Sequence, residues 1–259
     1  SQLLSYLGRV NYTLKDKYLF TASIRADGSS RFGEGNKYGY FPSMALGWRI
    51  SDEAFMDGVT ALSDLKLRAS YGLTGNQEIG NYQSLQLLGV SGTVVLNDGQ
   101  NIGIAPIQLA NPDLKWETTA QLDIGLDFEL FEGRISGSLD YFKKSTRDLL
   151  LYLPIPATSG FTTSLQNVGD TENTGFDFSI TSRNVTGPLN WTTTFVASHI
   201  KNKATNLGPL KEIYQGAVNF MPQLTVIRPG LPLNSYYGYE VEGIFQSADE
   251  VSSSAQPGA

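Results

Sequence analysis

The 259-residue sequence contains no cysteine, a single histidine and few charged residues. Without cysteine, the chain has no disulfide framework, no thiolate metal ligand and no thiol chemistry. No segment reaches the roughly 18 consecutive apolar residues that a membrane-spanning helix requires. Charged residues make up 17% of the chain, against about 25% in ordinary soluble domains, and the net charge is −6. This acidic balance argues against a nucleic-acid partner.

Glycine and aromatic residues are abundant instead, with 27 glycines, 13 tyrosines and 13 phenylalanines. Most of the chain alternates between apolar and polar residues with a period of two, which predicts β-strands. Several strands have about ten residues, the length that crosses a bilayer at a tilt. The eight predicted strands cover residues 6–14, 18–27, 44–50, 65–74, 120–129, 135–141, 176–180 and 191–197.

The alternation gives each strand two chemically different faces. In a membrane, the apolar row that includes Leu122, Ile124 and Leu126 would face lipid. The opposite row would then face a water-filled lumen. Its charged members are Arg9, Arg25, Lys66, Arg68, Asp123, Asp127 and Asp177.

The connections between strands alternate between short and long, which is typical of outer-membrane barrels with short periplasmic turns and long extracellular loops. We predict extracellular loops at 28–43, 75–117 and 144–174, within a region of transmembrane strands that spans residues 1–200. Residues 201–259 should form an extracellular loop region, truncated before the final strands. An intermediate link at 51–64 should hold a short helix near residues 52–56.

Aromatic residues fall near both predicted ends of the strands, as the two interfacial girdles of a membrane barrel would require. The inner band comprises Tyr12, Tyr18, Phe20, Trp48, Phe128 and Trp191. The outer band comprises Tyr71, Trp116, Tyr141 and Phe176.

Five stretches of distinctive sequence span nearly the whole chain. They are 25–32 (RADGSSRF) with 41–43 (FPS), 67–82 (LRASYGLTGNQEIGNY), 111–117 (NPDLKWE), 167–175 (NVGDTENTG) and 237–246 (YGYEVEGIFQ). Together, and in this order, they resemble the C-terminal half of the barrel in SusC/RagA-like TonB-dependent transporters of Bacteroidetes.

The resemblance implies an all-β protein of the outer membrane, an antiparallel transmembrane β-barrel of about 22 strands of which this chain would supply about eight. It implies TonB-driven import of bulky nutrients, either oligosaccharides or peptides, beneath a SusD-like surface lipoprotein. The chain would contact outer-membrane lipid, and TonB would act through a plug region that is missing here. No signal peptide precedes the first strand, so we expect an incomplete gene product or chain.

Candidate binding residues lie in the long outer loops, because such loops often carry function. We expect substrate contacts from loop amides and aromatics, although the tyrosines could equally pack against the lipoprotein. The candidates are Asn76, Gln77, Asn81, Tyr82, Tyr214, Tyr236 and Tyr237, with Tyr239 as a further aromatic. Residues 97–99 (NDG) predict a hairpin turn inside the second loop.

Other constellations favour structural roles over chemistry. The stretch 27–30 (DGSS) reads as a loop anchor more readily than as a calcium or sugar site. Asp123, Asp127 and Asp140 could form an acid–base pair, but ion pairing in a hydrated lumen is favoured. His199 has no triad or metal setting around it. We therefore expect no enzyme activity, cofactor or metal.

Two rival readings remain open from the residues. One is an outer-membrane barrel enzyme, which would need a nucleophile with a partnered base at the rim. The other is a soluble carbohydrate-binding or adhesin β-sandwich, whose strands also alternate. Release into buffer without detergent would favour the sandwich.

Overall fold

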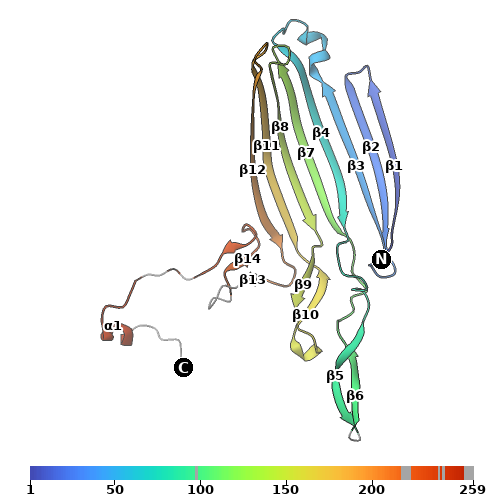
Figure 1. Cartoon of the computed structure of the whole chain (residues 1–259), viewed down its shortest axis with the longest axis vertical. Coiled ribbons are helices and arrows are strands. Elements are labelled where there is room, and N and C mark those ends of the chain that lie inside the picture. Colours follow the sequence, from blue (N-terminus) through green and yellow to red (C-terminus); the bar gives the residue numbers. More distant parts are fainter. Residues whose placement is uncertain (97–98, 217–222, 239, 241–242, 254–259) are drawn as a thin grey trace.

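The computed structural model describes residues 1–96, 99–216, 223–238, 240 and 243–253, and its main element is an eight-stranded antiparallel sheet. The strands adjoin in chain order, interrupted only by hairpins that belong to the loops (Figure 1). In sheet order they are β1 (Leu3–Leu14), β2 (Tyr18–Ser29), β3 (Tyr38–Arg49), β4 (Leu62–Asn76), β7 (Glu117–Leu130), β8 (Ile135–Arg147), β11 (Asp170–Val185) and β12 (Trp191–Asn206).

The other elements are short and lie in the connections. Among the residues that the structure describes, no helix has the length and apolarity needed to span a membrane. These elements are β5 (Leu88–Leu96), β6 (Gly99–Pro106), β9 (Leu150–Pro154), β10 (Thr163–Asn167), β13 (Ile213–Gln215), β14 (Thr225–Ile227), β15 (Ser235–Tyr236), α1 (Ala248–Ser253) and the 3₁₀ helices η1 (Ile50–Asp52), η2 (Ala54–Met56) and η3 (Ala157–Ser159).

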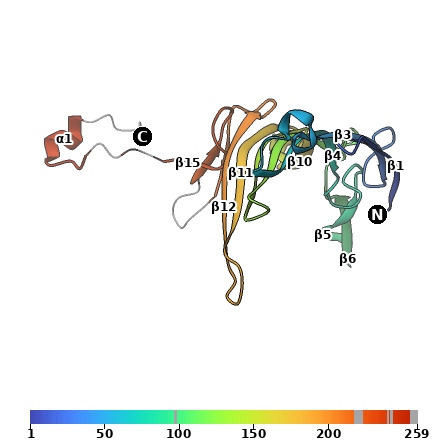
Figure 2. The ribbon, with the colours of Figure 1, turned by 90° about the horizontal axis from the view of Figure 1, so that it is seen from above.

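Strand register sorts the side chains of the sheet into an apolar and a polar face, because successive residues point to opposite sides. The two predicted faces are confirmed. On the apolar face Val10 is 63%, Ile124 44% and Leu139 46% exposed, and in the described part of the chain no second sheet covers them as a sandwich would require. Figure 2 shows the sheet curving from β1 round to β12. One row of this face, read from β1 to β12, contains Tyr12, Phe20, Leu46, Ala69, Ile124, Tyr141, Phe176 and His199.

Short turns gather at one end of the sheet and long connections at the other, as predicted (Figure 1). Two of the short turns place non-glycine residues in the left-handed region, with φ of 52° at Lys15, 56° at Asp16, 53° at Phe131 and 55° at Glu132. Positive φ at both central residues matches the turn to the twist of the flanking strands. The sheet therefore imposes this conformation on residues that do not favour it.

The predicted short helix near residues 52–56 is present as two 3₁₀ turns on either side of Glu53. The Glu53 carboxylate accepts hydrogen bonds from the Tyr18 hydroxyl at 2.6 Å, the Trp48 indole N–H at 3.1 Å and the Lys17 ammonium at 3.4 Å. These donors, the tyrosine foremost, hold the pKa of Glu53 below its usual range. The stabilisation is present above the carboxyl group's unfolded-state pKa and is lost as pH falls through the lower folded-state pKa.

Strand ends and one aromatic differ from the sequence predictions. β3 begins at Tyr38, β8 continues to Arg147 and β12 to Asn206, so the loops expected at 28–43 and 144–174 are shorter. The alternation pattern underestimates the length of these strands because their ends extend beyond the apolar band. Outside that band, polar residues suit both faces of a strand. Trp116 is not in the outer aromatic band. It is only 7% exposed and donates its indole N–H to the Lys37 carbonyl at 3.0 Å, inside the base of the loops.

A charge on the apolar face should destabilise the barrel far more than the same charge on the polar face. Ile124→Arg should cost about 2–4 kcal/mol, because the arginine would lie near the middle of the hydrocarbon layer. Gln121→Arg on the polar face of the same strand is the matched control and should cost much less. Urea titration of the complete protein in phospholipid vesicles, followed by heat-dependent gel migration, measures both. Equal losses would contradict the assignment of the faces.

Candidate functional site

The polar face carries a charge network that joins three strands. The Arg68 guanidinium donates to both carboxylate oxygens of Asp127, each at 2.7 Å, and to Asp140 at 2.9 Å. In the neighbouring row, Asp123 accepts hydrogen bonds from Gln121 at 2.9 Å and from Ser70 at 3.4 Å. Ion pairing is thus the observed state of Asp127 and Asp140, whereas the partners of Asp123 are neutral.

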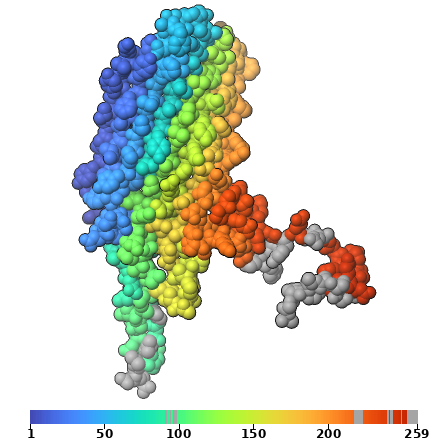
Figure 3. Space-filling model, turned by 180° about the vertical axis from the view of Figure 1, so that it is seen from behind, coloured from blue at the N-terminus to red at the C-terminus, as the bar shows by residue number. Residues whose placement is uncertain are grey.

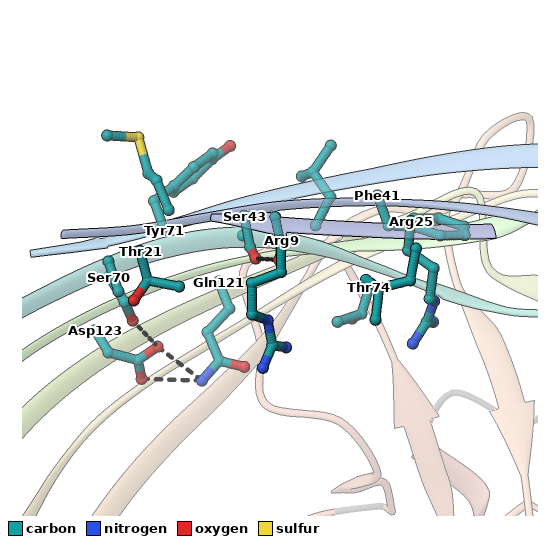
Figure 4. A pocket seen from close by; sticks show the side chains of 16 residues that line it. Arg9, Thr21, Arg25, Phe41, Ser43, Ser70, Tyr71, Thr74, Gln121 and Asp123 are labelled. Carbon is teal, nitrogen blue, oxygen red and sulfur yellow. Dashed lines mark hydrogen bonds between the residues drawn. The ribbon is translucent and has the colours of Figure 1, made fainter. Parts of the chain in front are cut away.

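An open depression of about 360 Å³ lies beside this network. Its polar lining includes Arg9, Ser70, Gln121 and Asp123, which Figure 4 shows on one side of the strands while Tyr71 points to the other. Because the depression is open and lined with donors and acceptors, it can hold water or a polar solute in passage.

An aromatic cluster closes the base of the long loops. Trp116 packs against Phe32 and Phe41, with ring centroids 5.4 and 5.5 Å apart. Leu114 is fully buried and Leu165 is 6% exposed in the same cluster. We call this group, which also includes Ile79, the loop-base cluster. It is the main apolar core in the described part of the chain, and it lies outside the strand region that would face lipid.

The loop-base cluster ties together three loops that are distant in the sequence. Phe32 comes from the connection β2–β3, Trp116 from β4–β7 and Leu165 from β8–β11. Polar contacts reinforce the last pair, since Lys115 and Asn167 exchange two hydrogen bonds of 2.8 Å. Figure 3 shows the bases of the loop extensions in contact.

Four of the predicted site residues lie beside this cluster. The Asn76 side chain accepts the backbone N–H of Glu78 at 2.9 Å, and the Gln77 carbonyl accepts Arg31 at 3.1 Å. Asn76 and Gln77 line an open pocket of about 350 Å³, while Asn81 and Tyr82 line a second of about 340 Å³. Arg31 lines both pockets, so these four residues form one continuous region.

Sequence reasoning placed Arg25 only in the lumen-facing row, missed Arg31, and treated Asp27 only as a loop anchor. The Asp27 side chain is buried and its Oδ2 accepts Arg25 Nε at 2.6 Å. Its Oδ1 and the Arg31 Nε are buried without a hydrogen-bond partner among the described residues. Asp27 and Arg31 both belong to the stretch 25–32. The charged residues among Gly and Ser in that stretch were the signal from which this region could have been predicted.

The small sheet of β13, β14 and β15, which holds the predicted Tyr214 and Tyr236, lies on the opposite flank of the loop end, near β12 (Figure 1). Tyr214 and Tyr237 form an edge-to-face pair with centroids 4.7 Å apart. The Tyr214 hydroxyl donates to Glu212, which raises the tyrosine's pKa and lowers that of the carboxyl group. Tyr236 is 96% exposed, and Tyr239 lies outside the described residues, as do Asn97 and Asp98 of the predicted turn between β5 and β6.

The predicted site residues thus fall into two groups, one lining the two pockets and the other around the Tyr214–Tyr237 pair. His199 is exposed on the apolar face opposite Phe176, away from both groups. Among the described residues, no three His, Asp or Glu side chains converge closely enough to hold a metal ion.

Comparison with known proteins gives a consistent picture. The model of the TonB dependent receptor-like β-barrel family matches residues 4–242. TonB-dependent receptor P3 of Formosa agariphila is 41% identical over 253 residues, covering 96% of this chain and 25% of the relative. TonB-dependent receptor SusC of Bacteroides thetaiotaomicron is 38% identical over 251 residues, covering 92% of this chain and 25% of SusC.

Solved structures agree with the sequence relatives. The chain superposes on the structure of the RagAB peptide transporter with a TM-score of 0.84 and 33% identity, covering 94% of this chain and 26% of that chain. The superposition on the RagAB peptide importer in an open-open state has a TM-score of 0.79 and 33% identity. It covers 90% of this chain and 25% of that chain. The chain therefore spans about a quarter of the length of the relatives it matches.

Adding one methyl group at Gly75 should loosen the loop-base cluster. A Cβ at Gly75 would lie 2.0 Å from the Phe41 ring, so Gly75→Ala must displace that ring and should cost about 1–3 kcal/mol. Gly58→Ala is the control, since no atom lies within 4 Å of its added Cβ. External protease added to intact cells should cleave the loops faster in the first variant only. Unchanged cleavage in Gly75→Ala would contradict the proposed tight packing.

Proposed function

We propose that this chain forms part of the wall of an active importer of bulky nutrients. The premise is that the chain belongs to the TonB-dependent receptor-like β-barrel family and lies in the outer membrane. The observation that carries the proposal is the eight-stranded sheet, which has one apolar face and one polar, charged face. The sequence of the chain aligns along nearly its whole length with a TonB-dependent receptor. The relatives are receptors and transporters by name, and we assign no chemistry to this chain.

The chemistry of the polar face suits the lining of a passage for hydrophilic solutes. Its Arg68 is matched by the carboxylates of Asp127 and Asp140, and other polar groups bond neighbours on adjacent strands, as Asp177 does with Ser198. Such a wall offers water and sugar or peptide groups many weak contacts and few strong ones. Weak contacts suit transport, because a solute must leave as readily as it enters.

The loops shape the entrance in this proposal. Residues 1–206 supply the wall and the loops between its strands, because β12 continues past the boundary expected at residue 200, and the residues beyond β12 belong to the extracellular loop region. The substrate contacts are assigned to Asn76, Gln77, Asn81 and Tyr82 on one flank and to Tyr214, Tyr236 and Tyr237 on the other. Amides suit hydrogen bonding to hydroxyl or peptide groups, and exposed tyrosine rings suit stacking.

The substrate is proposed to be an oligosaccharide or a peptide. The likeness to structures named as a peptide transporter supports the peptide, while the family resemblance of the sequence leaves the oligosaccharide equally open. A SusD-like lipoprotein would cover the loop end, and TonB would power the import.

Uptake in living cells tests the proposal. Cells carrying the complete gene should accumulate a labelled oligosaccharide or peptide pool, and loss of TonB or of the gene should abolish this. Asn76→Ala with Gln77→Ala should weaken apparent affinity about tenfold, as expected for two lost hydrogen bonds. Asn184→Ala, an amide at the short-turn end, is the control and should change nothing. Uptake that persists without TonB would contradict the proposal of active import.

A further inference from the structure

One group of charges on the apolar face stands apart from the lumen network. Lys143 on β8 and Lys203 on β12 both contact the Glu172 carboxylate of β11, at 2.8 and 2.9 Å. Lys201, two residues from Lys203 on the same face, has no ion pair among the residues that the structure describes. We call Lys143, Lys201 and Lys203 with Glu172 the outward lysine cluster.

Register places the cluster on the lipid-facing side. Thr174 of β11 lies opposite both Lys143 and Lys201, and Glu172 lies opposite Lys203. The same face holds Phe176 one row nearer the short turns, where it lies opposite Tyr141 and His199. The lysines therefore follow the aromatic row directly, on the side of the long loops.

The distance along β12 gives the height of the cluster. Lys201 lies ten residues beyond Trp191, the aromatic at the short-turn end. Ten residues extend about 33 Å along a strand, and a tilt of about 40° reduces this to about 25 Å along the membrane normal. That equals the height of the apolar band of an outer-membrane barrel. The ammonium groups thus lie at the headgroup level of the outer leaflet, which long lysine side chains can also reach by extending away from the hydrocarbon.

The cluster is confined to one part of the circumference. On the other strands, the part of this face nearer the long loops carries Tyr6 on β1, Ala26 on β2, Tyr40 on β3, Leu73 on β4 and Ala120 on β7. Those positions hold no charge. A general need for charge at the membrane boundary would distribute lysines more evenly around the wall. A bound group at one place explains their concentration on β8 and β12.

We propose that the outward lysine cluster binds the phosphate group of a lipid headgroup in the outer leaflet. Three ammonium groups against one carboxylate leave two positive charges, which suits a phosphate. Glu172 holds two of the lysines apart and orients them, and Lys201 supplies the unpaired donor. The lipid's acyl chains would then lie along the aromatic row of Tyr141 and Phe176, whose rings are 5.0 Å apart. This assignment rests on the membrane position of the chain and not on what is transported.

The test is native mass spectrometry of the complete receptor, extracted from cells in mild detergent, with lipid phosphate measured per protein. Lys143→Gln, Lys201→Gln and Lys203→Gln combined should lower the retained phospholipid at least fivefold. Lys144→Gln is the matched control, because Lys144 neighbours Lys143 on β8 but points to the polar face, where it stacks over Phe142. Glu172→Gln should retain as much lipid as the parent or more, since it removes the competing negative charge.

Two further measurements decide between sources of phosphate and guard against misfolding. Heat-dependent gel migration should be unchanged in every variant that is compared. Lipid that has been enzymatically dephosphorylated should not be retained, and inorganic phosphate at millimolar concentration should not replace the lipid. Equal lipid retention in the triple variant and the parent would overturn the proposal, as would equally tight binding of inorganic phosphate alone.

Discussion

A peptide group inside a bilayer has no water with which to bond, so each N–H and C=O in the hydrocarbon layer needs a partner from the protein. Within the sheet the strands satisfy this through continuous antiparallel pairing, from Leu3 opposite Ser29 on one side to Asp170 opposite Asn206 on the other, and among the described residues the outer edges of β1 and β12 are left to pair with further strands of the wall. Once the pairing is fixed, the rows of side chains follow from the period of two. A shift of one residue would turn Ile124 to the lumen and Asp123 to lipid, so the register tolerates no such slip. The lumen network, the aromatic rows and the outward lysine cluster are all consequences of this one arrangement.

The strand region could be predicted well from the sequence, because each strand there meets two uniform environments. Residues 120–129 show it best: every apolar side chain of that stretch lies on one face. The alternation fails where the environments are no longer uniform. β3 gains six residues at its start and β12 extends to Asn206, since these ends are surrounded by loops on one side and water on the other.

The loop end was harder to predict for a different physical reason. Trp116, Phe32 and Leu165 come together only because three loops fold back over the barrel rim, and no local periodicity records such a contact. The same holds for the buried Asp27 and Arg31, whose neighbourhood depends on residues almost fifty positions away, as in the hydrogen bond from Arg31 to the Gln77 carbonyl. Residue types pointed to a binding surface in this region, but its division into two separate flanks required the structure.

The loop-base cluster has a consequence for how proteins of this design can diversify. Because Phe32, Trp116 and Leu165 bind three loops into one packed platform, the hairpin β5–β6 emerges from a foundation that does not depend on its own sequence, whereas the hairpin β9–β10 contributes Leu150 and Leu165 to that foundation. Insertions, deletions or exchanges at the hairpin tips then leave the platform and the barrel unchanged. New specificities can arise by replacing what stands on the platform, while a substitution within it, such as at Gly75, would affect all three loops together.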